Sequence, residues 1–145
     1  MLQETIERES LPVHQLGVVA KGAYTQITGI VAPSSAAPGS RVDITVKIKN
    51  IYSSTIGIMV GGSLDYGVTP WPSITFPTYS ANVDAGQTYS FSGYFTMPDK
   101  KVTIHAYSYW YGDDGWHYDE EMTKNMSVSE VVYDFAIGQP SASAV

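Results

Sequence analysis

The stretch RVDITVKIKN, residues 41–50, alternates without interruption between polar and apolar side chains. Its apolar positions are Val42, Ile44, Val46 and Ile48, and its polar positions include Asp43, Thr45, Lys47 and Lys49. Successive side chains of a β-strand point to opposite faces of the sheet, so this pattern gives one apolar face and one polar face. The stretch therefore predicts a strand of an antiparallel sheet that is buried on one face and solvated on the other.

Similar stretches lie on both sides of this one and are separated by turn-forming segments. We expect further strands at 24–32, 55–67, 88–97, 102–111 and 116–130, with 131–137 as one more. Gly61 and Gly62 predict a bulge or bend within 55–67. Three prolines in 68–80 exclude a central strand, so this segment is expected to be an irregular edge or a crossing connection. The pattern predicts an all-β fold, an antiparallel β-sandwich of about seven strands.

The two ends of the chain differ from the sandwich, which we place at 24–137. In residues 1–23, Leu2 and Ile6 have the spacing of one face of a short helix. Two interpretations fit this segment, a mobile terminus or an arm that docks on a neighbouring subunit. The apolar side chains of such an arm are Leu2, Ile6, Leu11, Val13, Leu16 and Val18. The small polar residues of 138–145 predict a flexible tail.

The composition indicates one domain with an uncharged polar surface. Of the 145 residues, 43% are hydrophobic and 15% are charged, against roughly 25% charged in typical soluble proteins. The net charge of −6 at pH 7 disfavours nucleic acid as a partner. The lack of cysteine excludes disulfides and a cysteine nucleophile. No membrane span and no Sec signal are visible. We therefore expect a virion component or an extracellular surface protein, without membrane insertion.

Two stretches have a familiar order of turns and strands. They are VAPSSAAPGSRVDITVKIKN, residues 31–50, and VDAGQTYSFSGYFTMPDKKVTIHAYSYWY, residues 83–111. In the first, a "P…PG" turn precedes a strand that ends in Asn; in the second, an "AG" turn precedes a strand of the form "xFxxxFxMP". This order resembles immunoglobulin-like modules of the CARDB and cell-adhesion-related type, over roughly residues 24–128. The resemblance implies an Ig-like β-sandwich of a kind found on cell surfaces and in phage and virus structural proteins, and it implies no activity.

The sequence GDDG, residues 112–115, joins two predicted strands. Glycine and aspartate tolerate positive φ and form local hydrogen bonds, so a tight hairpin turn explains both acids. Calcium is the alternative, because Asp113, Asp114 and Asp119 would offer carboxylate oxygens. However, Asp119 would lie down the return strand and away from the turn. These three residues are therefore only weak calcium candidates, and the sequence predicts no metal site.

No sequence motif of a known catalytic site is present: there is no GxSxG, no HExxH and no phosphate loop. Glu120 and Glu121 are adjacent and would face opposite sides of a strand, unlike the facing pair of a glycosidase. His105 and His117 lie on neighbouring predicted strands, but zinc would need a third ligand that the sequence does not place. We predict no enzymatic activity and no cofactor.

Aromatic side chains are the most suggestive feature. The alternation in 102–111 places tyrosines on one face and Trp110 on the opposite face, toward the core. The predicted exposed aromatic face consists of Trp71, Tyr107, Tyr109, Tyr111 and Trp116. Such a row offers a rigid amphipathic surface to a partner. The competing interpretation is that this face is covered and that the tyrosines are buried.

The sequence thus predicts a non-enzymatic structural or assembly protein. The leading hypothesis is a virion component, a capsid decoration or cement protein or a tail-associated protein, that acts through its N-terminal arm and sandwich contacts. Its partners would be other protein subunits, either copies of itself or capsid or tail proteins, in an oligomer or lattice. The alternative is a cell-surface adhesion or carbohydrate-binding module that contacts glycans through exposed tyrosine and tryptophan.

Overall fold

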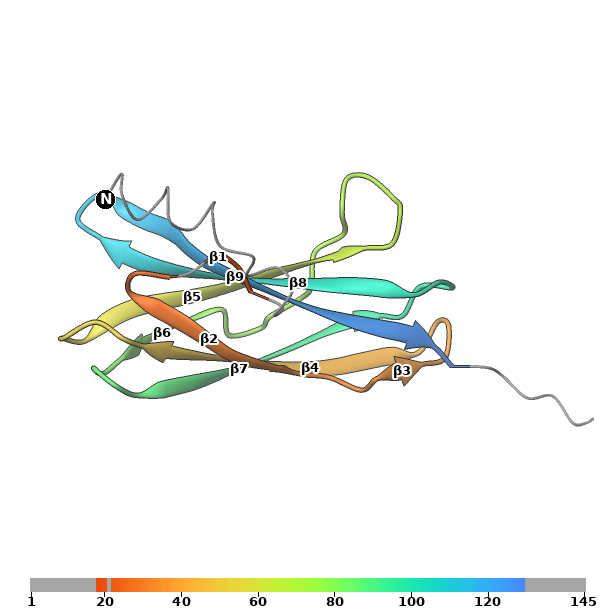
Figure 1. The fold of residues 1–145 in the computed structure, drawn as a ribbon, viewed down its shortest axis with the longest axis horizontal. Helices are drawn as coiled ribbons and strands as arrows, with labels where there is room; N and C mark the ends of the chain where they lie inside the picture. Colours follow the sequence, from red (N-terminus) through yellow and green to blue (C-terminus); the bar gives the residue numbers. More distant parts are fainter. Residues whose placement is uncertain (1–17, 21, 130–145) are drawn as a thin grey trace, which may run out of the picture.

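The computed structural model describes residues 18–20 and 22–129, which form a β-sandwich (Figure 1). The strands are β1 (Val18–Ala20), β2 (Thr25–Val31), β3 (Ser35–Ala36), β4 (Arg41–Asn50), β5 (Ile56–Asp65), β6 (Ser80–Val83), β7 (Thr88–Thr96), β8 (Val102–Gly112) and β9 (Gly115–Val128). All except β1 and β3 have four residues or more. The short helix, the strand at 131–137 and the tail that the sequence predicts lie outside the described residues.

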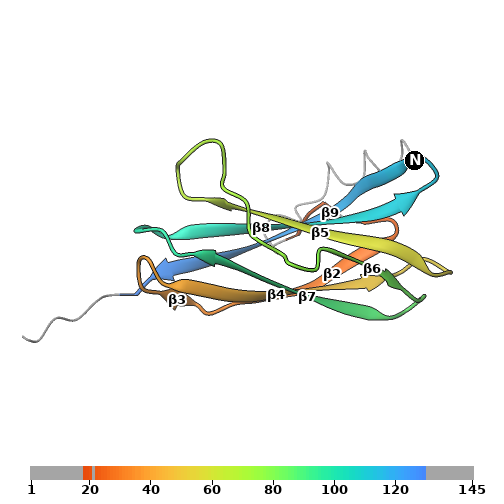
Figure 2. The same ribbon diagram turned by 180° about the vertical axis from the view of Figure 1, so that it is seen from behind.

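The strands form two sheets that face one another (Figures 1 and 2). The large sheet has the order β1-β9-β8-β5-β6, and the small sheet has the order β2-β4-β7. The two-residue strand β3 is added to β9 in parallel, whereas the other strand pairs are antiparallel. The predicted antiparallel sandwich is confirmed.

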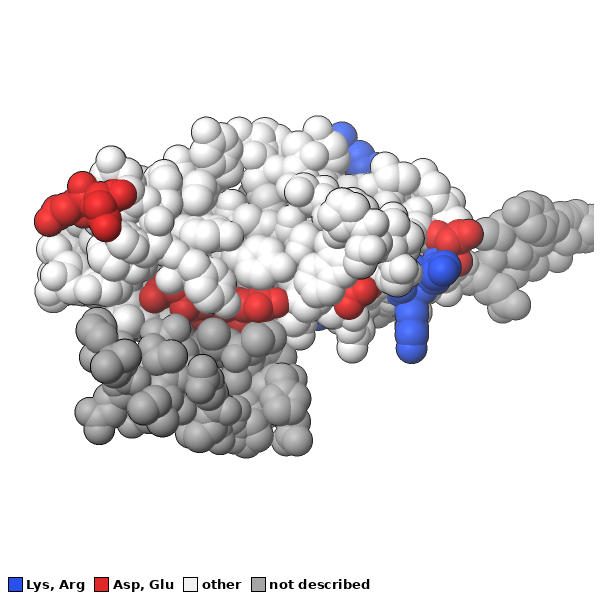
Figure 3. Space-filling view, turned by 90° about the horizontal axis from the view of Figure 1, so that it is seen from above, with Lys and Arg blue, Asp and Glu red and all other residues white. Residues whose placement is uncertain are grey.

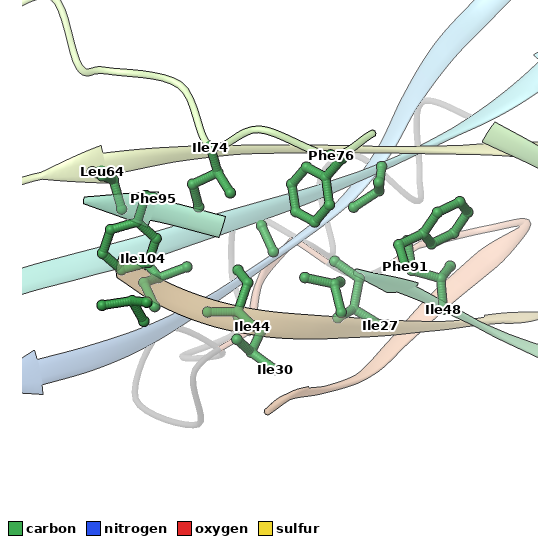
Figure 4. Close-up of a cluster of buried hydrophobic side chains, with 14 of the residues drawn as sticks. Ile27, Ile30, Ile44, Ile48, Leu64, Ile74, Phe76, Phe91, Phe95 and Ile104 are labelled. Carbon is green, nitrogen blue, oxygen red and sulfur yellow. The ribbon is translucent and has the colours of Figure 1, made fainter. Parts of the chain in front are cut away.

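The core lies between the two sheets, and β4 is the central strand of the small sheet. Its four apolar side chains are buried, and its polar side chains alternate with them toward the solvent, as predicted. Figure 4 shows the side chains that surround them. They include Ile27, Leu64, Phe91, Phe95 and Ile104. Full burial of one such side chain contributes about 1.5–3 kcal/mol, so the alternation in β4 decides which face turns inward.

The predicted bulge at Gly61 and Gly62 is wrong. β5 pairs with β8 through both glycines without a register shift. Gly62 makes room for a neighbouring side chain instead, because a Cβ atom there would lie 2.9 Å from Cδ1 of Ile74. A Cβ atom on Gly61 would lie 3.4 Å from the ring of Tyr109, which is an ordinary contact.

The segment between β5 and β6 is the predicted crossing connection. It forms one bridge to the large sheet, Ser63 with Ser73, and one to the small sheet, Thr75 with Tyr94. Between these bridges the chain passes from one sheet to the other and buries Ile74. The connection therefore covers one open side of the sandwich and contributes to the core (Figure 4).

Strand β1 lies inside the segment that the sequence assigns to the N-terminal arm. Its backbone pairs with β9, Val18 with Met122 and Ala20 with Glu121, so the large sheet begins before residue 24. The apolar arm positions before Val18 lie outside the described residues, and the arm remains a prediction. The described residues include no helix of the length and hydrophobicity that crossing a membrane requires.

Candidate functional site

The outer face of the large sheet carries a group of aromatic side chains, which we call the aromatic face. It consists of Trp71, Tyr107, Tyr109, Tyr111, Trp116 and Tyr118. Cross-strand pairing places Tyr118 beside Tyr109 and Trp116 beside Tyr111. The structure thus brings the predicted aromatic residues to one face and adds Tyr118. Figure 3 looks onto this side of the molecule, where wide areas carry neither acidic nor basic side chains.

Tyr107 and Tyr109 are half-buried. Their exposure is therefore intermediate between the two interpretations of the sequence, an exposed aromatic face and a covered one. The Tyr107 hydroxyl is hydrogen-bonded to Ser63 Oγ at 2.8 Å. The Tyr118 ring meets both tyrosines edge-on, with ring centroids 6.4 and 6.0 Å away. Burial raises the pKa of both half-buried phenols above their ordinary value. These contacts hold the rings in place, so the face has little side-chain entropy to lose when it binds a partner.

The end of the aromatic face near Trp71 is built on a histidine–glutamate pair. His105 Nδ1 donates a hydrogen bond to Glu121 Oε2 at 2.5 Å, because a carboxylate can only accept. Trp71, from the β5–β6 connection, stacks on the His105 ring at 4.4 Å. The Nε2 atom of His105 is buried without a hydrogen-bond partner among the described residues. Ser63, the cross-strand neighbour of His105, bonds Tyr107 instead, so no serine–histidine nucleophile pair forms there.

The connection between β8 and β9 is the tight hairpin turn that the sequence predicts. Gly112 pairs with Gly115, and Asp113 and Asp114 form the two-residue loop between them. Gly115 has φ of +116°, a conformation that favours glycine. The Asp114 carboxylate accepts a hydrogen bond from His117 Nε2, which lowers the pKa of Asp114. Both acids are therefore explained by the turn.

Two buried carboxylates, Asp119 and Glu120, are the polar feature that sequence reasoning missed. On β9, Glu120 pairs with Ser108 and Tyr118 pairs with Tyr109, which leaves Asp119 as the extra residue of a β-bulge. The bulge turns two consecutive acids inward, and each is only 3% exposed. Three acids in a row on a strand would otherwise alternate in direction, so the sequence carried no signal for the bulge.

Asp119 binds the segment of the chain that passes from β1 in the large sheet to β2 in the small sheet. Its carboxylate accepts hydrogen bonds from the backbone N–H groups of Ala23, Tyr24 and Thr25, at 2.9, 3.1 and 2.7 Å. It also accepts one from Thr25 Oγ1 at 2.6 Å, and that hydroxyl contacts Ser108 Oγ at 2.7 Å. Hydrogen bonds of this kind are what permits a carboxylate to be buried.

Glu120 binds the other sheet in a similar way. Its Oε1 accepts a hydrogen bond at 3.0 Å from the N–H of Ile27, on the edge strand β2 of the small sheet. Glu121 faces the opposite side, as predicted, and contacts His105. The carboxylates of this strand therefore organise the sandwich. Asp119 is engaged at the crossing, away from the hairpin loop, and the described part of the chain contains no group of three metal-ligating side chains.

Comparisons with known proteins show the fold and no family. No family model matches the chain, and no curated protein sequence matches it. Among solved structures, the CARDB domain of a Pyrococcus furiosus protein in complex with di-metal ions has a TM-score of 0.55 at 11% identity, over 75% of this chain and 92% of that one. A PapD-like domain of human CEP192 has a TM-score of 0.52 at 8% identity, over 77% and 89%.

A third similar chain comes from the complex of zinc 2-glycoprotein with prolactin inducible protein from human seminal plasma. Its TM-score is 0.54 at 11% identity, and the match covers 75% of this chain and 97% of that one. At such low identity these likenesses establish an immunoglobulin-like β fold, which agrees with the fold that the sequence predicts.

Proposed function

We propose that this chain is a non-enzymatic interaction module that associates with copies of itself through the aromatic face. The observation that carries the proposal is the grouping of partly exposed aromatic rings on one rigid sheet surface. Aromatic side chains contribute much of the binding energy at protein interfaces, and they do so best when they are held in position before binding.

Charge supports the choice of a second copy as the partner. The members of the aromatic face are uncharged, and the neighbouring Glu121 carboxylate is already paired with His105. Two such faces can therefore meet without burying an unpaired charge, even though the chain has a net charge of −6. In a two-fold interface, the aromatic face of one copy would pack against the same face of the other copy.

The finer proposal is a structural role in a larger assembly, with a virion as the leading setting. It rests on the low charged fraction, the lack of catalytic sequence motifs and the resemblance to modules that occur in virus structural proteins. Two of the similar solved structures are a complex of two proteins and a PapD-like domain, which is in keeping with an interaction module. An extracellular surface is the alternative setting.

The experiment is the solution mass of the full chain, measured by light scattering on a sizing column over a range of concentrations. We expect an oligomer that dissociates when Tyr111 and Tyr118 are both replaced by serine. Tyr52→Ser is the control, because Tyr52 is similarly exposed but lies on the β4–β5 connection. A chain that is monomeric at all concentrations would contradict the proposal, and so would an oligomer that the double substitution leaves intact.

A further inference from the structure

A cleft of about 450 Å³ lies on the large sheet between β6 and the end of the β8–β9 hairpin, across β5. Its lining residues are Gly57, Ser80, Ala81, Asn82, Tyr111 and Trp116. They come from four strands, β5, β6, β8 and β9. None of them carries a charge, and they combine two aromatic rings with an amide and a hydroxyl.

The two aromatic rings form a corner. The ring planes of Tyr111 and Trp116 are inclined at 69°, with centroids 5.1 Å apart. Tyr111 is 55% exposed and Trp116 is 40% exposed, so both rings present apolar surface to the solvent. One ring can therefore stack against the flat side of a ligand while the other contacts its edge.

Gly57 keeps the floor of the cleft open. A Cβ atom at this position would lie 3.2 Å from Cβ of Tyr111, 3.5 Å from the Trp116 ring and 3.6 Å from Oδ1 of Asn82. A larger side chain would thus occupy the space between the aromatic corner and the amide. The φ angle of Gly57 is not in the left-handed region, so the conformation of the backbone does not require glycine here.

The polar side of the cleft is available to a ligand. Asn82 pairs with Gly57 through the β5–β6 ladder, and its side chain is exposed. Within the described part of the chain, the side-chain amide of Asn82 makes no hydrogen bond. An amide offers both a donor and an acceptor, which matches vicinal hydroxyl groups that act as both.

We propose that this cleft binds a neutral saccharide. A sugar ring has an apolar C–H face, which fits the Tyr111–Trp116 corner, and a rim of hydroxyl groups, which fits Asn82 and Ser80. The uncharged lining favours neutral sugars over sialylated or sulfated ones, because an anionic group would lose its solvation without gaining a cationic partner. The site goes beyond the proposed self-association, and because Tyr111 and Trp116 belong to both surfaces, we expect sugar binding and self-association to compete.

The test is an NMR titration of the isotopically labelled full chain with maltohexaose, cellohexaose and chitohexaose, each in turn. For an open site with two rings we expect a dissociation constant on the order of 1 mM, with shifts of the Trp116 indole and the Asn82 amide. Trp116→Ala and, separately, Asn82→Ala should each weaken the binding about tenfold, which corresponds to about 1.4 kcal/mol.

Trp71→Ala is the matched control, because Trp71 is 38% exposed and contacts His105, six residues along β8 from Tyr111 or roughly 20 Å at strand rise. Binding that this control retains and Trp116→Ala loses supports the site. The inference is overturned if none of the three sugars shifts Trp116 and Asn82, or if the Asn82 shift survives Trp116→Ala. The titration is made at a protein concentration at which the solution mass is that of a monomer, so self-association does not cover Tyr111 and Trp116 and the two proposals are tested separately.

Discussion

The Asp119 carboxylate lies where the chain passes from β1 in the large sheet to β2 in the small sheet. It satisfies three consecutive backbone N–H groups and one hydroxyl in a buried position. This set of hydrogen bonds stabilises the fold only while all its donors have an acceptor, because each buried donor that loses its acceptor costs about 1–3 kcal/mol. Asp119 is therefore a structural residue and not a ligand for a cation.

Replacing Asp119 with alanine should lower the free energy of unfolding by about 3–5 kcal/mol, because the substitution leaves its buried donors without a partner. Urea denaturation followed by circular dichroism measures this change. Asp113→Ala is the control: Asp113 is exposed in the hairpin loop, and we expect a change within about 0.5 kcal/mol. Equal stabilities of the two variants would refute the role of Asp119.

Gly93 on β7 gives a second prediction at this scale. A Cβ atom there would lie 2.6 Å from the Phe76 ring and 2.9 Å from the carbonyl oxygen of Thr75. Gly93→Ala should therefore destabilise the protein by about 1–3 kcal/mol through overpacking. Gly29→Ala is the matched control on β2, because no atom lies within 4 Å of its Cβ position. Thermal unfolding of the two variants compares them, and a Gly93→Ala protein as stable as Gly29→Ala would contradict the packing argument.

At the scale of single elements, the β8–β9 hairpin carries the aromatic face except Trp71, and it also carries the Asp114–His117 contact. The hydrogen bond from His117 lowers the pKa of Asp114, so the contact is present above the ordinary aspartate range and is lost as the pH falls through the lowered pKa. Replacing His117 with phenylalanine keeps a ring beside Trp110 and removes the donor. NMR titration should then show a higher pKa for Asp114 in the variant, and an unchanged value would mean that the contact does not exist in solution.

The half-buried tyrosines of β8 make the stability of the fold depend on pH in the alkaline range. Burial raises the folded-state pKa of Tyr107 and Tyr109, so their contribution to stability is complete below a pH of about 10 and is lost as the pH rises through the raised values. We expect the free energy of unfolding to fall above that pH. In the Tyr107→Phe/Tyr109→Phe variant the fall should be shallower. Urea denaturation at several pH values measures both slopes, and identical slopes would contradict this account.

The strands that sequence reasoning found are those with a strong local pattern. The alternation in β4, and in β8 as far as Ser108, predicts which side chains are buried, and the structure confirms it. The expectation that Trp110 turns toward the core is wrong, because Trp110 is only half-buried and stacks on Tyr24 with ring centroids 4.0 Å apart. β1, β3 and β6 were missed because they have only three, two and four residues, too few to show a period. The bulge predicted at Gly61 and Gly62 is wrong because a glycine that makes room for a side chain, as Gly62 does for Ile74, has the same local sequence as one that forms a bulge.

At the scale of the whole molecule, the contacts that could not be predicted from the sequence are those between residues far apart in the chain. Asp119 and Thr25 are 94 residues apart, and only the packed sandwich brings them together. The face shared by Tyr107, Tyr109 and Tyr111 follows from the period of one strand and was predictable. Its extension by Tyr118 follows from the two-residue hairpin loop, which sets the pairing of Tyr109 with Tyr118, whereas no local pattern encodes the bulge that comes after Tyr118 at Asp119.

The central claim at this scale is that the aromatic face is an interface between copies of the chain. Hydroxyl-radical footprinting of the full chain over a concentration series tests it most directly, because it reports the solvent exposure of individual aromatic side chains. We predict that Tyr111, Trp116 and Tyr118 become protected as the solution mass rises, while Tyr52 stays reactive. Assembly with Tyr52 protected and the aromatic face unchanged would contradict the account, and so would unchanged reactivity with a monomer mass at every concentration.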